Sequence, residues 1–250
     1  MRPTIRLVLI TALRDRLFLS LFALLVSALG GAIYLSGGAV FEQVETAAVY
    51  SAGSARAIIV LGLIVFVGFQ VERMFDNREV EAILSRAISR DKFIFAYWAG
   101  LAVIGAMFVA PVAMLLNWIA PNAAGSALWS ISLVFEVWLV LAFAVFAGFT
   151  FERAVPTVLA TIGFYVLSRL MSVFTGIAAQ GKQSGANQIT NPVIDAIALA
   201  LPRLDLFAQS HWLIYGPPSR TVIAVVAIQS AIFVPLLMLA ATFDLRRRQF

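Results

Sequence analysis

The stretch ALWSISLVFEVWLVLAFAVFAGF, residues 127–149, contains a single charged residue, Glu136. About 20 apolar residues in a helix cross a hydrocarbon core of about 30 Å, because each residue adds about 1.5 Å. Similar apolar runs, bounded by charges or by Pro, Gly and Asn, occur at about 17–35, 56–71, 94–117, 157–177 and 221–243. The sequence therefore predicts an all-α, polytopic membrane protein with six transmembrane helices in one domain, 1–250.

The composition favours the same class. Hydrophobic residues make up 62% of the chain and charged residues 12%, whereas a soluble domain carries about 25% charged residues. The net charge is +5, but the basic residues lie at the ends of apolar runs without interleaved aromatics, so no nucleic-acid partner is expected. With no cysteine and one histidine, no metal site is expected either. The first apolar run is too long for a cleaved signal peptide.

The distribution of basic residues predicts the orientation. If the amino terminus is cytoplasmic, thirteen of the eighteen Lys and Arg residues lie in cytoplasmic segments and four outside, with Arg169 inside a span. Cytoplasmic loops carry an excess of Lys and Arg. We therefore expect a multi-pass protein of the bacterial inner membrane with both termini in the cytoplasm. The longest external segment, about 178–220, is expected to contain a short helix that lies on the outer face or re-enters slightly.

The amino-terminal stretch, residues 2–16, has apolar residues at helical spacing between arginines. This pattern is typical of a helix that lies in the membrane interface. The alternative is that the stretch only extends the first span into the headgroups.

One segment is dense in charge, residues 72–93, between the second and third spans. Asp76 is followed three residues later by Glu79, which is the pattern of a helix start, where side chains accept from free backbone N–H groups. The sequence therefore predicts a short amphipathic cytoplasmic helix that begins near Asn77. The alternative is an ordinary solvated loop that balances its own charges.

The sequence Leu84-Ser85-Arg86-Ala87-Ile88-Ser89-Arg90, followed by Phe93, resembles the cytoplasmic motif of ABC-2 type transporter permeases. Ala87 stands where that motif usually has proline. The sequences at 243–248 and 201–205 are also similar to members of this family, including permeases of the nitrous-oxide-reductase maturation type. The family has six spans, an amino-terminal interfacial helix and a coupling helix between spans two and three.

The resemblance implies a permease subunit that acts as a dimer with a second copy or a paralogue, in contact with membrane lipids and driven by two copies of a separate ABC ATPase subunit. A periplasmic or accessory subunit is a further possible partner. ATP and Mg would be held by the ATPase, so this chain would be no enzyme and hold no cofactor. The expected ATPase-coupling residues are Arg78, Glu79, Glu81, Leu84, Ser85, Arg86, Ile88, Ser89 and Arg90.

Two ionisable residues lie inside predicted spans. Glu136 and Arg169 both fall roughly 12–14 Å below the expected outer boundary, at 1.5 Å per residue. Charges within the membrane usually face the bundle interior and pair with one another. We therefore expect an intramembrane charge pair, which would either line a substrate path or clamp two adjacent spans together.

Two other functions remain open from the sequence. A secondary transporter or channel that works without ATP would need polar ligands or broken helices near mid-span. A non-transporting assembly subunit of a larger membrane complex would need neither. The spacing Gly176-x-x-x-x-Gly181-Lys182 is that of a phosphate-binding loop, but Gln183 follows where such a loop has Ser or Thr. An ATP site in this chain is therefore not expected.

Overall fold

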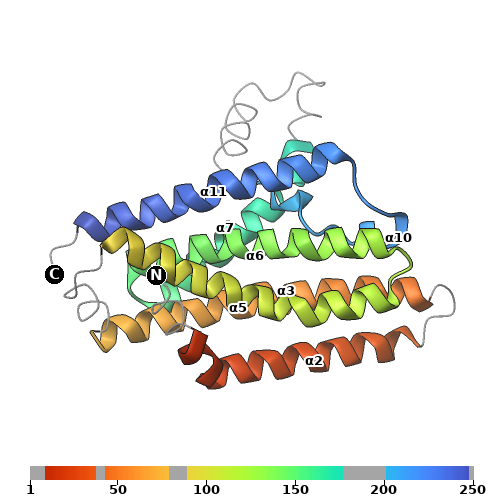
Figure 1. Cartoon of the computed structure of the whole chain (residues 1–250), viewed down its shortest axis with the longest axis horizontal. Helices are drawn as coiled ribbons and strands as arrows, with labels where there is room; N and C mark the ends of the chain where they lie inside the picture. The colour runs from red at the N-terminus through yellow and green to blue at the C-terminus, as the bar shows by residue number, and fades with distance from the viewer. Residues whose placement is uncertain (1–8, 38–42, 79–88, 177–200, 248–250) are drawn as a thin grey trace.

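The computed structural model describes residues 9–37, 43–78, 89–176 and 201–247, and within these ranges every regular element is helical. The elements are α2 (Arg16–Ser36), α3 (Gln43–Asp76), α5 (Arg90–Ile119), α6 (Ala123–Phe151), α7 (Ala154–Arg169), a 3₁₀ turn η1 (Leu204–Leu206), α10 (Trp212–Tyr215) and α11 (Arg220–Arg247). The long helices lie side by side along the longest axis of the molecule (Figure 1).

Five helices of the described part are long and apolar enough to cross a membrane, namely α2, α3, α5, α6 and α11. The predicted fifth span, 157–177, corresponds to α7, which has only 16 residues and ends at Arg169. Leu170 leaves the helical conformation, and a further helical stretch follows at 171–176. The structure therefore shows a multi-pass helical protein, in which five rather than six helices of the described residues meet the length of a span.

Helix α6 is the centre of the bundle and packs against α3, α5, α7, α10 and α11 (Figure 1). Its sequence is predominantly apolar around the helix, as expected of a helix in the core of a membrane bundle. The contact with α5 is close, because a Cβ on Gly105 would lie 2.6 Å from Val137 Cγ1. Two reciprocal hydrogen bonds join the same helices, from Trp98 Nε1 to the Trp138 carbonyl at 3.2 Å and from Trp138 Nε1 to the Ala102 carbonyl at 3.1 Å.

The amino-terminal part is separate from the first long helix. Residues 9–14 are helical, and Asp15 then leaves the helical conformation with φ −75° and ψ 133°. Its carboxylate accepts from the Leu17 backbone N–H at 2.9 Å and so caps the start of α2. This break favours a distinct amino-terminal helix over a simple extension of the first span.

Helix α3 is longer at both ends than the second span predicted from the sequence. The second span was expected at about 56–71, but α3 runs from Gln43 to Asp76, because Arg56 is accommodated inside the helix instead of ending it. Asp76 is the last residue of α3, and Asn77 and Arg78 form a turn in which Arg78 has φ 55°. The rest of the cytoplasmic helix predicted to begin near Asn77 lies outside the described residues.

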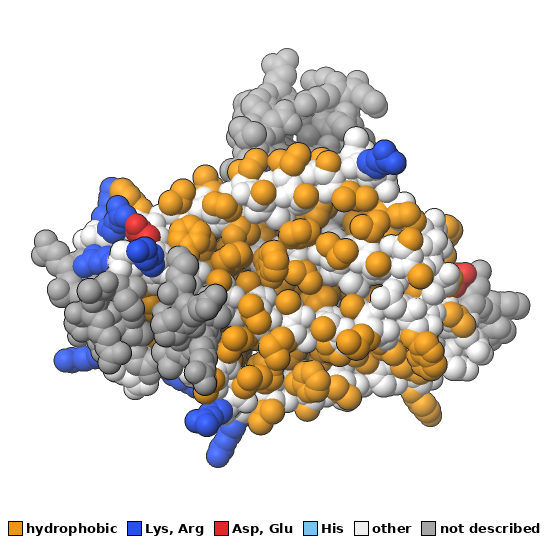
Figure 2. Space-filling view, in the orientation of Figure 1, with side chains coloured by type: hydrophobic (Ala, Val, Ile, Leu, Met, Phe, Trp, Pro, Cys, Tyr) orange, Lys and Arg blue, Asp and Glu red, His pale blue; other side chains and the backbone are white. Residues whose placement is uncertain are grey.

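Charged side chains gather at the end of the bundle where the first and last described residues lie, while hydrophobic side chains cover most of the visible face between the ends (Figures 1 and 2). Ion pairs at this basic end join neighbouring helices. Arg73 of α3 pairs with Asp15 before α2 at 2.6 Å, and Asp91 of α5 pairs with Arg246 of α11. A hydrophobic belt with charges at its margin is the surface expected of a bundle that crosses a bilayer.

Candidate functional site

From residue 201 to the end of α10, the described chain packs into the bundle away from the basic end (Figure 1). We call residues 204–213 the inserted segment. Its side chains at Leu204, Phe207, Ala208 and Leu213 are fully buried. The segment contacts α6, α7 and α3 through η1 and α10. Residues 177–200 of the predicted external segment lie outside the described residues, and the inserted segment is the described part that packs inside the bundle.

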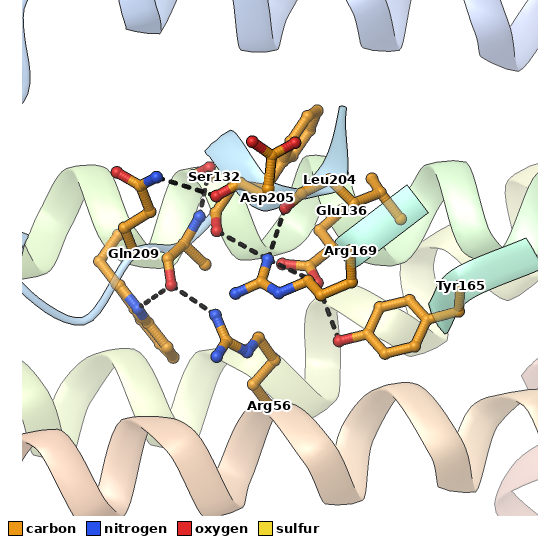
Figure 3. Close-up of polar contacts among 11 residues, drawn as sticks. Arg56, Ser132, Glu136, Tyr165, Arg169, Leu204, Asp205 and Gln209 are labelled. Carbon is orange, nitrogen blue, oxygen red and sulfur yellow. Dashed lines mark hydrogen bonds and ion pairs between the residues drawn. The ribbon is translucent and has the colours of Figure 1, made fainter. Parts of the chain in front are cut away.

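Arg169, at the end of α7, joins the inserted segment to the centre of the bundle. Its Nη1 donates to the carbonyl oxygen of Leu204 at 2.5 Å and to that of Phe207 at 3.0 Å. The same nitrogen lies 3.5 Å from Glu136 Oε1 (Figure 3). The structure thus brings together the two residues whose depths match in the sequence, and adds a segment that the sequence did not place there.

Glu136 lies on α6 with no exposed surface. Its Oε1 accepts a hydrogen bond from the Tyr165 hydroxyl at 3.1 Å as well as facing Arg169 (Figure 3). Its Oε2 is also buried and has no hydrogen-bond partner among the described residues. A buried carboxylate oxygen without a partner is costly, so this atom is an acceptor that a further donor would stabilise.

Ala208 is held by three side chains from α3 and α6. Arg56 Nη1 and Trp129 Nε1 donate to its carbonyl oxygen at 2.6 Å and 2.8 Å, and its N–H donates to Ser132 Oγ at 3.0 Å. Its φ of 42° lies in the left-handed region, which residues other than Gly, Asn and Asp seldom adopt. The contacts therefore hold Ala208 in a strained conformation.

The site carries an excess of positive charge. Two guanidinium groups, of Arg56 and Arg169, face the inserted segment, and Glu136 is the only carboxylate that pairs with either of them in the described part of the chain. Arg56 lies about 20 Å along α3 from its first residue, at about 1.5 Å per residue. A cation at this depth without a carboxylate partner is costly in a membrane and indicates a functional site.

Sequence reasoning found Glu136 and Arg169 but missed Arg56, Trp129 and Tyr165. Arg56 is one of the four basic residues that the sequence places outside, because it bounds the apolar run 56–71. The sequence feature that could have revealed its position is the mostly apolar stretch at 47–55. This stretch allows a longer helix with Arg56 inside. Nothing local to Trp129 or Tyr165 indicates their partners, because both bonds join residues far apart in the chain.

The structure describes three of the nine expected ATPase-coupling residues, Arg78, Ser89 and Arg90. The other six, namely Glu79, Glu81, Leu84, Ser85, Arg86 and Ile88, lie outside the described residues. Ser89 has extended backbone angles and is the N-cap of α5. Arg90 Nη1 donates to the carbonyl oxygens of Leu245 at 2.7 Å and Arg246 at 3.2 Å, which are among the last carbonyls of α11. Arg90 therefore joins the start of α5 to the end of α11.

No protein-family model matches this chain, and no curated protein matches it. The resemblance to ABC-2 type permeases therefore rests on the motif at 84–93 and on the arrangement of apolar helices around it.

Proposed function

We propose that this chain is the permease subunit of an ABC transporter, acting as a dimer of permeases and driven by a separate ATPase, in the direction of export. The observation that carries the proposal is the attachment of the charged segment 72–93 at both of its ends. At the α3 end, Glu72 lies 3.8 Å from Arg153, which precedes α7. At the α5 end, Arg90 and Asp91 bind the end of α11.

A segment attached in this way can transmit a displacement. A partner that pulls on residues 79–88 would move α5 and α11 together, and both of these helices pack on α6, which carries Glu136. Coupling of this kind needs a contiguous connection between two sites and two arrangements of the packed helices. In the proposed orientation the basic end faces the cytoplasm, where ATP is present, and α7 with residues 171–176 forms the fifth of six spans.

Copurification tests the proposal. The double substitution Glu79→Lys and Glu81→Lys is expected to reduce the amount of ATPase that copurifies in mild detergent by about tenfold, the change for about 1.4 kcal/mol of lost binding. Glu45→Lys, at the opposite end of α3, is the matched control and should leave the ATPase bound. If the wild-type chain copurifies with no ATPase, the proposal is wrong and an ATP-independent transporter or an assembly subunit takes its place.

Arg90 should affect transmission instead of docking, because its described bonds are made to α11 within the chain. The chain has no cysteine, so Ser210→Cys in the inserted segment can be labelled alone by a maleimide. With the ATPase bound, we expect ATP to change the labelling rate of this cysteine, and Arg90→Ala to abolish the change while the ATPase still copurifies. Loss of the ATPase from Arg90→Ala, or an unchanged response to ATP, would contradict this role.

A further inference from the structure

We infer that Arg56 and Arg169 form a binding site for the acidic headgroup of an amphiphilic molecule, and that the inserted segment occupies this site in the present structure. The inference rests on the proposed function in so far as the amphiphile would be the cargo. Four observations support it: the excess charge, the strain at Ala208, the unpartnered oxygen of Glu136 and an adjoining apolar crevice.

The charge selects an anion. Arg56 and Arg169 together donate to three backbone carbonyl oxygens, those of Leu204, Phe207 and Ala208 (Figure 3). Carbonyl oxygens carry only partial charge, whereas a phosphate or carboxylate binds guanidinium groups through shorter and stronger charge-assisted bonds. The carbonyls therefore stand where the oxygens of an acidic group would bind more strongly.

The strain makes the inserted segment replaceable. Ala208 keeps its left-handed backbone, with φ 42°, through the bonds from Arg56 and Trp129 to its carbonyl oxygen. When an anion takes the guanidinium of Arg56, one of these bonds is lost and the residue can return to a favourable region of backbone space. Strained residues of this kind are common at ligand clamps and switch regions.

Glu136 restricts the headgroup further. Its buried Oε2 has no partner in the described part of the chain. A fully ionised headgroup has no hydrogen-bond donor and would leave this oxygen without a partner. A phosphate monoester that keeps one P–OH offers acceptor oxygens for Arg56 and a hydroxyl donor for Glu136 Oε2. The site therefore fits an acidic headgroup that also carries a hydroxyl donor.

The apolar part of the ligand has a place beside the headgroup. A crevice of about 40 Å³ lies between α6, α10 and α11, and its lining includes Ser132, Phe135, Trp212 and Val226. Ser132 lines the crevice and also binds the inserted segment, because its hydroxyl accepts from the Ala208 N–H. A cavity of this size holds a few heavy atoms, which is sufficient for the first methylenes of an alkyl chain that continues along the apolar surface of α11.

Labelling of the single cysteine in Ser210→Cys tests the site on the full-length chain in dodecyl maltoside. Dodecyl phosphate should raise the rate of maleimide labelling by about tenfold. This is the change expected if binding raises the equilibrium constant for displacement of the inserted segment by about tenfold. Additional dodecyl maltoside, which has the same alkyl chain and no charge, should leave the rate unchanged. Equal acceleration by both detergents, or by neither, would overturn the inference.

Variants separate binding from loss of folding. Arg56→Gln should abolish the response to dodecyl phosphate, whereas Arg56→Lys, which keeps the charge, should retain part of it. Arg220→Gln removes an exposed cation at the start of α11 and should keep the full response. A full response in Arg56→Gln would also overturn the inference. ATPase copurification does not require this site. Absence of the labelling response would therefore not contradict the proposed function, and absence of the ATPase would not contradict the binding site.

Discussion

Replacing Arg169 with methionine is expected to destabilise the protein by about 3–5 kcal/mol, the typical cost of removing one partner from a buried ion pair. The variant leaves Glu136 fully buried without its cation and removes the Arg169 donor from the carbonyl oxygens of Leu204 and Phe207, of which Leu204 keeps the bond from the Phe207 N–H. The free energy of unfolding, measured by titration with sodium dodecyl sulfate in mixed micelles, is the readout. Arg153→Met is the matched control, because its side chain is 69% exposed and lies 3.8 Å from Glu72; exposed pairs contribute about 0–1 kcal/mol.

The double variant Glu136→Gln with Arg169→Met decides whether the two charges are coupled. Glutamine removes the unpaired charge, so the double variant should be more stable than Arg169→Met alone. It should not reach the wild-type value, because the bonds from Arg169 to the inserted segment are still absent. A double variant no more stable than Arg169→Met would show that the ion pair contributes no coupling energy, and that Arg169 acts only as a donor to the segment.

The sequence predicts this pair but not its surroundings, for a physical reason. The depth of a residue in a span follows from counting residues along a helix, so Glu136 and Arg169 could be matched without a structure. The position of Arg56 inside a helix could not be predicted in this way. A charge in an apolar run is tolerated only when a partner satisfies it, and the partner of Arg56 is the Ala208 carbonyl, 152 residues away. The limits of α3 were missed for the same reason.

The charged segment shows a different limit. The pattern Asp76 followed by Glu79 is typical of a first helical turn, but acidic residues also occur in the last turn of a helix that continues from a membrane span. The structure places Asp76 at the end of α3. In contrast, the sequence places Arg90 within a motif, and the structure adds a function for it within the chain, as a donor to the last carbonyls of α11. Basic side chains are favourable at such a helix end.

Gly125→Ala should release the inserted segment from the other side, by steric conflict instead of loss of charge. A Cβ on Gly125 would lie 1.8 Å from the Trp212 carbonyl oxygen and 2.8 Å from the Trp212 carbonyl carbon. Both are backbone atoms of α10, so no side-chain rotation relieves the overlap and the segment must shift. We expect a loss of about 1–3 kcal/mol in the free energy of unfolding, the usual cost of overpacking, together with faster labelling of Ser210→Cys.

The matched control is Gly163→Ala on α7, where no heavy atom lies within 4 Å of the added Cβ; this variant should be neutral or stabilised by up to about 1 kcal/mol, the difference in helix propensity. Comparing Gly125→Ala with Arg169→Met separates the two contributions that hold the segment. If steric packing of α10 on α6 and the guanidinium bonds act independently, the two losses of stability will add. If Gly125→Ala leaves both the stability and the labelling rate unchanged, α10 does not pack on α6 as described, and the bonds from Arg56 and Arg169 alone hold the inserted segment.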